Sequence, residues 1–207
     1  MTMQLVIGNK RTSSWSMRPW IAMRHAGIAF QEAHVTLRQP DTRSQILRHS
    51  PAGHVPVLKH DGRLVWDSLA ILEYAAELAP DAGLWPIARA TRAEARAVSA
   101  EMHSGFMALR QEMPMDCTST LTVAPSAEAQ ADIARIVQLW EDCRARHAGA
   151  GDFLFGGFTN ADAMFAPVVS RFITYGVDLP PAAAAYRDAV SSLPAYRAWL
   201  DGAAAEA

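Results

Sequence analysis

The stretch Thr12-Ser13-Ser14-Trp15-Ser16-Met17-Arg18-Pro19-Trp20 decides how the N-terminal part of the chain folds. It follows the apolar run 4–7 and leads into an apolar segment that ends at Gly27, which predicts a turn from a first strand into a first helix. Ser16 is expected to cap this helix and Pro19 to lie in its first turn. The serine hydroxyls then lie at the positive end of the helix dipole, where an anion such as a thiolate is stabilised.

Taken alone, these serines have a simpler interpretation, in which they cap the helix and fill a polar turn. No histidine or aspartate lies at a spacing diagnostic of a serine nucleophile, and the chain has no G-x-S-x-G elbow. A hydroxyl in this turn is therefore a poor nucleophile but a good hydrogen-bond donor. The stretch by itself leaves both interpretations open.

The segment 1–80 predicts an α/β domain with the element order β-α-β-α-β-β-α. Its signals are an alternating strand over 30–37, a short helix over 42–48 capped by Asp41, a hairpin at Asp61-Gly62 between strands 57–59 and 63–66, and a helix that opens at Asp67-Ser68. The first crossover runs through a helix, which favours a parallel pair, and the hairpin adds an antiparallel one.

A composition break over 81–87 predicts a linker, and the segment 88–207 predicts an all-helical domain. The expected elements are a long helix over 88–112, a helix over 126–147 broken at Gly149-Ala150-Gly151, a helix opened by the capping box Thr159-Asn160-Ala161-Asp162, and two short helices flanked by Pro180-Pro181 and Leu193-Pro194.

Composition restricts the class of protein. The chain has 207 residues, half of them hydrophobic, and a net charge of −2, so it can bury a real core and has no basic run for nucleic acid or a membrane surface. No apolar run approaches the roughly 20 residues of a membrane helix, and the N-terminus lacks a secretion-signal layout. Cys117 and Cys143 have no metal or C-x-x-C spacing, so we expect a reduced, cytoplasmic protein without a metal.

Two further motifs accompany the serine turn. His54-Val55-Pro56 is typical of a cis-proline turn, which leaves the backbone of Val55 free to pair with an extended peptide. Asp67-Ser68 at a helix start suits an amine and a carboxylate. An amine, a carboxylate, a peptide and a thiol together match glutathione. Each motif alone also has a structural interpretation: Val55 as core, Asp67-Ser68 as a helix cap, and His54 as a loop histidine.

In order and spacing these motifs resemble the cytosolic glutathione S-transferases, over essentially the whole chain. SSWSMR is similar to the serine-type signature of the zeta class, which has cysteine where this chain has Trp15. SPAGHVPVL resembles the family's cis-proline loop, and WDSLAILEYAAE resembles its acid-serine helix. The resemblance implies a thioredoxin-like N-terminal domain, glutathione as co-substrate, a homodimer and a role in detoxification.

The resemblance also implies site residues. It assigns glutathione binding to Ser13, His54, Val55, Pro56, Asp67 and Ser68. Ser13 is expected to donate to the sulfur, with Ser14 as the rival catalytic serine. Val55 is expected to pair with the cysteinyl backbone, Asp67 and Ser68 to hold the γ-glutamyl end, and His54 to lie near the glycyl carboxylate.

The expected chemistry is activation of the glutathione thiolate for attack on an apolar electrophile held between the domains. The candidate walls of that pocket are Trp15, Met102, His103, Phe106 and Met107, with Met113 and Met115 beyond them. Trp15 in place of cysteine weakens the case for a maleylacetoacetate isomerase and for a thiol transferase. A glutathione-dependent isomerase or dehalogenase, which returns glutathione, and a non-enzymatic binding module remain as alternatives.

Overall fold

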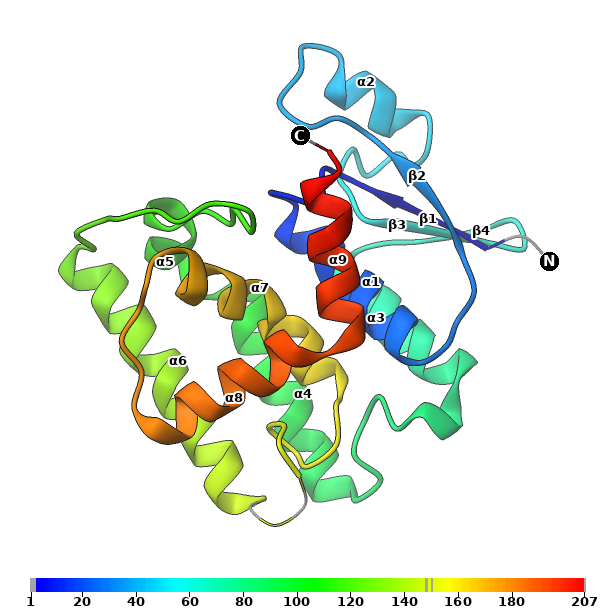
Figure 1. The fold of residues 1–207 in the computed structure, drawn as a ribbon. Coiled ribbons are helices and arrows are strands. Elements are labelled where there is room, and N and C mark those ends of the chain that lie inside the picture. Colours follow the sequence, from blue (N-terminus) through cyan, green and yellow to red (C-terminus); the bar gives the residue numbers. More distant parts are fainter. Residues whose placement is uncertain (1–2, 148, 150, 207) are drawn as a thin grey trace.

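The computed structural model describes residues 3–147, 149 and 151–206 and has the predicted two-part architecture (Figure 1). The N-terminal part is built on a mixed sheet with the strand order β2-β1-β3-β4. Its strands are β1 (Met3–Ile7), β2 (Gln31–His34), β3 (Val57–His60) and β4 (Arg63–Val65). β1 is parallel to β2 and β3 is antiparallel to β4, as predicted, and β3 is also antiparallel to β1.

The helices of the N-terminal part have the predicted order: two of them lie between strands and the third follows β4. They are α1 (Ser14–His25), α2 (Thr42–Leu47) and α3 (Ser68–Leu78). α1 and α3 pack against each other, and their apolar residues join those of β1 and β3 in one core. The start of α1 and the start of α3 are therefore held on the same rigid framework.

Two details of this part differ from the prediction. The second strand covers only Gln31–His34 rather than 30–37, although Val35 beyond its end is buried as expected. Asp41 precedes α2, but within the described chain its side chain makes no cap bond and instead accepts from Gln45 Nε2 at 2.7 Å. Alternation of apolar residues thus located the buried face better than it located the strand ends.

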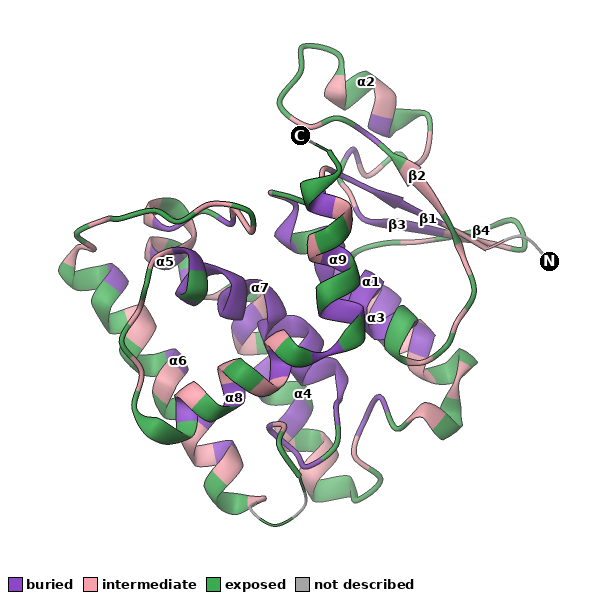
Figure 2. Ribbon diagram, in the orientation of Figure 1, coloured by how far each residue is buried: buried purple, intermediate pink, exposed green. Residues whose placement is uncertain are grey.

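The second part is helical. Its elements are the 3₁₀ turn η1 (Pro80–Ala82), α4 (Arg89–Ser104), α5 (Met107–Glu112), α6 (Ala127–Arg146), α7 (Asn160–Thr174), α8 (Pro181–Ser192) and α9 (Pro194–Ala204). Every residue of α7 except Ile173 is buried (Figure 2), and α7 packs against α1, α4 and α8. α9 packs against α1, so the chain returns to the N-terminal part at its end (Figure 1).

The prediction of one long helix over 88–112 is wrong, because the chain breaks between α4 and α5. Gly105 is extended (φ −104°, ψ −169°) and Phe106 is left-handed (φ 61°). The side chain of Arg110 donates to the Gly105 carbonyl at 2.9 Å, and Asp132 of α6 accepts from the Leu109 N–H at 3.0 Å. These side-chain bonds satisfy backbone groups at the break, whereas the apolar spacing continues across it and conceals it.

The capping box at the start of α7 is confirmed. Asp162 accepts from the backbone N–H and the hydroxyl of Thr159 at 2.7 and 2.9 Å. Burial raises the pKa of Asp162 to about 6. The expected break at Gly149-Ala150-Gly151 includes Ala150, which lies outside the described residues. The domain boundaries at 80 and 88 stay a prediction. The described part of the chain contains no helix that could span a membrane.

Candidate functional site

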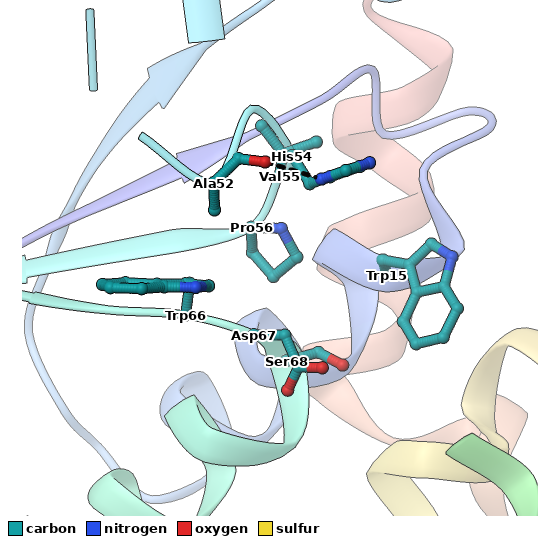
Figure 3. A pocket seen from close by; sticks show the side chains of 8 residues that line it. All are labelled: Trp15, Ala52, His54, Val55, Pro56, Trp66, Asp67 and Ser68. Carbon is teal, nitrogen blue, oxygen red and sulfur yellow. Dashed lines mark hydrogen bonds between the residues drawn. The ribbon is translucent and has the colours of Figure 1, made fainter. Parts of the chain in front are cut away.

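A cavity of about 240 Å³ lies where the start of α1, the loop before β3 and the start of α3 meet (Figure 3). Its lining residues are Trp15, Ala52, His54, Val55, Pro56, Trp66, Asp67 and Ser68. The fold therefore brings together the cis-proline motif and the Asp67-Ser68 motif, which the sequence analysis assigned to one ligand. The serine turn borders the cavity through Trp15.

The loop before β3 has the expected geometry. The Val55–Pro56 peptide bond is cis, which confirms the predicted turn. Within the described residues, neither the N–H nor the C=O of Val55 has a hydrogen-bond partner. His54 Nδ1 donates to the Ala52 carbonyl at 2.8 Å, so in the neutral ring Nε2 carries a lone pair. The Val55 backbone is thus available to a peptide, whereas His54 can donate to a carboxylate through Nε2 only as imidazolium.

Asp67 is the N-cap of α3. Its Oδ1 accepts from the N–H groups of Leu69 and Ala70 at 3.0 and 3.4 Å. Its side chain is still 52% exposed, and Oδ2 lies 2.9 Å from His103 Nε2. Ser68 beside it is buried, and its hydroxyl has no partner among the described residues. A buried hydroxyl without a partner next to a half-exposed carboxylate suits a ligand that carries both an acceptor and a cation.

His103 was predicted to lie in the wall of the apolar pocket. The structure places it on α4 against Asp67, and its ring forms a T-shaped pair with the Trp15 ring at 5.2 Å between centroids. His103 therefore connects the helical part to the Asp67 carboxylate. No local motif signals this pair, because its members are far apart in the sequence.

At the serine turn, α1 begins at Ser14, so the prediction that Ser16 caps the helix is wrong. The Asn9 carbonyl accepts from the Thr12 and Ser13 N–H groups at 3.2 and 2.8 Å, which starts the helical winding earlier. Ser16 is fully buried inside α1, where it accepts from the Gly8 N–H at 3.1 Å. Its oxygen lies 2.7 Å from that of Ser13. Pro19 likewise falls inside α1 rather than in its first turn.

A second cavity of about 200 Å³ also borders Trp15. Its lining residues are Thr12, Ser14, Trp15, Arg38, Arg110, Pro114, Met115 and Arg171. Ser13 and Ser14 are both buried, and Ser14 opens onto this second cavity. Trp15 lines both cavities, so a ligand in the first and a ligand in the second would meet at this residue.

The second cavity is basic rather than apolar. The guanidinium groups of Arg18 and Arg110 lie 4.3 and 5.1 Å from the Trp15 ring centroid. Arg18 is fully buried and has no hydrogen-bond partner in the described chain. Burial, and then the charges of Arg110 and Arg171, hold the pKa of Arg18 well below its usual range. Burial lowers the pKa of Arg171 to about 10. These cations favour an anion beside Trp15.

The methionine and phenylalanine walls that the sequence analysis expected are mostly elsewhere. Trp15 lines both cavities and Met115 lines the second. Met102, Phe106 and Met113 are buried in the core, and Met107 is 56% exposed. The arginines in their place were not predicted, because Arg38, Arg110 and Arg171 come from three separate segments and share no sequence motif.

Comparisons with known proteins give the family. The sequence models of the glutathione S-transferase N-terminal and C-terminal domains match residues 12–78 and 92–202. The chain therefore belongs to the glutathione S-transferase family, as its motifs predicted.

Curated relatives cover a shorter region. A probable maleylacetoacetate isomerase of Caenorhabditis elegans is 36% identical over 97 residues, which are 47% of this chain and 45% of the relative. The maleylacetoacetate isomerase of Rhizobium meliloti is 40% identical over 88 residues, 42% of this chain and 41% of the relative. The matched region thus spans less than half the length of each relative.

Solved structures share the fold over the whole chain. A glutathione transferase homologue from Burkholderia, solved with bound glutathione, covers 100% of both chains with a TM-score of 0.76 at 23% identity. A glutathione transferase from Methylococcus capsulatus gives a TM-score of 0.74 at 24% identity and covers 99% of this chain and 100% of its own. At these identities the likeness shows the fold alone.

Proposed function

We propose that this protein is a glutathione-dependent transferase that binds glutathione in the first cavity and activates its thiol at the start of α1. The single observation that carries the proposal is the meeting of the cis-proline loop, Asp67-Ser68 and Trp15 around one cavity. These elements offer a free peptide backbone, a carboxylate, a hydroxyl and a helix N-terminus. Each of them suits a different part of glutathione.

The γ-glutamyl end fits the start of α3. The ammonium group suits the half-exposed Asp67 carboxylate, and the carboxylate suits the Ser68 hydroxyl, which has no partner among the described residues. The cysteinyl N–H and C=O suit the Val55 backbone in the manner of an added strand. The thiol then points toward α1.

The serine turn supplies the activation. An ordinary thiol has a pKa near 8.5 and is mostly protonated at neutral pH. A hydroxyl donor and the positive end of α1 both favour the thiolate and lower that pKa. Ser13 is our candidate donor, with Ser14 as the alternative. Because hydroxyl protons rotate, the Ser16 hydroxyl can donate to Ser13 Oγ and leave the Ser13 proton free for sulfur.

The arginines of the second cavity favour a more specific candidate, in which the second substrate carries a carboxylate. Arg110 and Arg171 line this cavity, and Arg18 is buried beside it. An apolar electrophile leaves these cations without a counterion, whereas an anionic one neutralises them. Maleylacetoacetate, the substrate in the names of two relatives, is itself a carboxylate. A glutathione-dependent isomerase on such a substrate is therefore the second candidate function.

Calorimetry with glutathione tests the first step. Binding at a hundredfold excess over the dissociation constant raises the free energy of unfolding by about 2.7 kcal/mol. No heat and no shift in melting temperature at millimolar glutathione would remove the proposal. A panel of matched electrophiles with and without a carboxylate then tests the second substrate, and assay of free glutathione separates consumption from return.

A cytoplasmic location and a homodimer belong to the same proposal, and both rest on family resemblance. Cys117 and Cys143 are free thiols, which is compatible with a reducing compartment. Light scattering on the purified protein measures its mass in solution. A monomer at micromolar concentration would remove the dimer from the proposal without affecting the glutathione site.

A further inference from the structure

The segment Gly8–Thr12, which we call the 8–12 loop, delivers the chain from β1 to the serine turn. It ends directly before Ser13, and the Asn9 carbonyl accepts from the Ser13 N–H at 2.8 Å. A displacement of this loop therefore displaces Ser13. What holds the loop in place also sets the position of the candidate catalytic hydroxyl.

The backbone polar groups of Lys10 and Arg11 all have partners, and in the described chain every one of these partners lies beyond residue 115. The Lys10 carbonyl accepts from Trp199 Nε1 of α9 at 2.9 Å. The Arg11 carbonyl accepts from the Cys117 N–H at 3.1 Å. Both N–H groups donate to the carboxylate of Glu206, at 2.9 Å from Lys10 and 3.4 Å from Arg11.

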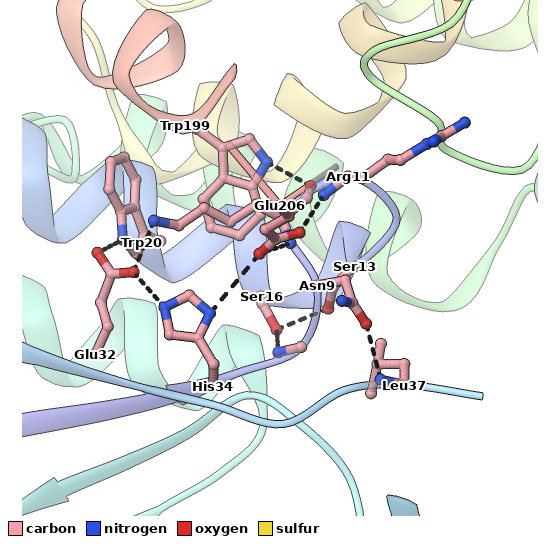
Figure 4. Close-up of polar contacts among 12 residues, drawn as sticks. Asn9, Arg11, Ser13, Ser16, Trp20, Glu32, His34, Leu37, Trp199 and Glu206 are labelled. Carbon is pink, nitrogen blue, oxygen red and sulfur yellow. Dashed lines mark hydrogen bonds and ion pairs between the residues drawn. The ribbon is translucent and has the colours of Figure 1, made fainter. Parts of the chain in front are cut away.

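Glu206 follows α9 and lies over the 8–12 loop (Figure 4). Its side chain is 22% exposed, and one of its oxygens lies 3.7 Å from His34 Nδ1 at the end of β2. A carboxylate that accepts from two consecutive N–H groups resembles the anion at a helix N-terminus. It fixes the direction of both peptide planes at once.

The rest of α9 does not depend on Glu206. Trp199 is fully buried, and α9 comes so close to the loop that a Cβ built on Gly202 would lie 2.7 Å from Lys10 Cδ. The side chains of the loop have their own anchors as well, Lys10 on Glu32 at 2.7 Å and Arg11 on Asp116 at 2.7 Å. Removal of the Glu206 carboxylate should therefore leave the protein folded and release only the two N–H groups.

We propose that Glu206 is a positioning residue for the serine turn: its carboxylate holds the Lys10 and Arg11 amides and so fixes Ser13 against the sulfur of glutathione. The inference rests on the proposed function. It assigns a catalytic consequence to a residue almost 200 positions from the serine that it positions.

The test compares Glu206→Ala and Glu206→Gln with the wild type and with Asp201→Ala. Gln keeps one acceptor oxygen without the charge. Asp201 is an exposed acid on α9, so its variant controls for a lost carboxylate on the same element. The measurements are amide hydrogen exchange at Lys10 and Arg11, kcat and KM for glutathione, and the pKa of the bound thiol.

In Glu206→Ala we expect faster exchange at both amides and a rise of about one unit in the bound-thiol pKa, which leaves about tenfold less thiolate and lowers kcat by about tenfold at neutral pH. KM for glutathione should change little, because Asp67, Ser68 and Val55 stay in place. Gln should recover part of the loss, and Asp201→Ala should match the wild type.

Two results would overturn the inference. One is unchanged exchange at Lys10 and Arg11 in Glu206→Ala. The other is faster amide exchange with an unchanged bound-thiol pKa and kcat, which would mean that Glu206 holds the 8–12 loop without affecting catalysis. A wild-type protein that fails to bind glutathione would instead remove the proposed function itself, so the two failures are distinguishable.

Discussion

α3 begins with a side-chain cap, whereas α1 begins without one. Asp67 accepts from the N–H groups of Leu69 and Ala70, so the first turn of α3 already has an anion. At α1 the N-cap is Ser13, which makes no cap bond within the described residues; its hydroxyl turns to Ser16 instead. Both helices start at the candidate site, but only α1 leaves its positive end for a ligand.

This difference teaches which charge belongs at each end of the site. The capped start of α3 presents a carboxylate, so it suits an ammonium group, with Ser68 for the carboxylate beside it. The uncapped start of α1 presents donors, so it suits a thiolate. Glutathione has its charges in that arrangement, and the predictions below test each end of it in turn.

The largest effect should come from Asp67. Asp67→Ala removes the carboxylate proposed to hold the ammonium, and loss of a charged hydrogen bond weakens glutathione binding by about 1.5–3 kcal/mol. The lost helix cap costs about 1 kcal/mol of stability in addition. Asp67→Asn separates the two, because it keeps a cap acceptor and loses the charge. Equal glutathione dissociation constants for Asn and wild type would show that Asp67 is a cap only.

Ser16→Ala tests the other helix start. It leaves the Gly8 N–H without its acceptor in a buried site, which should cost about 1–3 kcal/mol of stability. If Ser16 supports Ser13, the bound-thiol pKa should also rise. Ser99→Ala is the matched control, since Ser99 is equally buried inside α4 and, among the described residues, its hydroxyl bonds only the Ala95 carbonyl. If neither Ser16→Ala nor Ser99→Ala raises the bound-thiol pKa, and Ser13→Ala keeps its activity, the hydroxyl donor lies elsewhere.

Asp116→Asn should have a smaller effect that depends on pH. The hydrogen-bonded Arg11 side chain lowers the pKa of Asp116 to about 2, below its ordinary value of 3.8. A depressed pKa stabilises the fold above about pH 4, and this contribution is lost as the pH falls through about 2. Above pH 4 we expect the free energy of unfolding of Asp116→Asn to be about 0.5–1 kcal/mol lower than that of the wild type. Urea unfolding of both proteins near pH 2 and above pH 4 measures this difference in stability. A stability difference of the same size near pH 2 would contradict the contribution of the ion pair.

The smallest effect should come from the thiols of the protein itself. Burial raises the pKa of Cys117 and of Cys143 to about 11, so both stay protonated at neutral pH. Both should react slowly with thiol reagents in the folded protein, and Cys117→Ser should leave kcat and KM for glutathione unchanged. Loss of turnover in that variant, with the fold intact, would bring protein thiol chemistry into the mechanism.

The sequence predicted the features that depend on neighbouring residues. The cis-proline turn, the α3 start at Asp67-Ser68 and the capping box of α7 each lie within a few residues, and the element order of the N-terminal part followed from their spacing. Ser16 was misplaced because a serine three residues before a proline is typical of a helix start, whereas here the Asn9 carbonyl begins the helical winding earlier.

The features that the sequence did not predict are contacts between distant segments. Asp67 with His103 and the Lys10 amide with Glu206 join residues that share no local pattern. The basic second cavity is similar, since its arginines come from three separate segments: Arg38 follows β2, Arg110 lies on α5 and Arg171 on α7. Periodicity reports which face of a helix is buried, but it does not report which buried faces meet.

Ultraviolet titration of glutathione bound to wild type, Ser13→Ala and Ser14→Ala tests the central claim most directly, because the thiolate absorbs and the thiol does not. The account predicts a bound-thiol pKa below about 8.5 in the wild type, a rise in Ser13→Ala and a smaller change in Ser14→Ala. A larger rise in Ser14→Ala would transfer the role to Ser14. An ordinary thiol pKa in the wild-type complex would contradict activation at the start of α1.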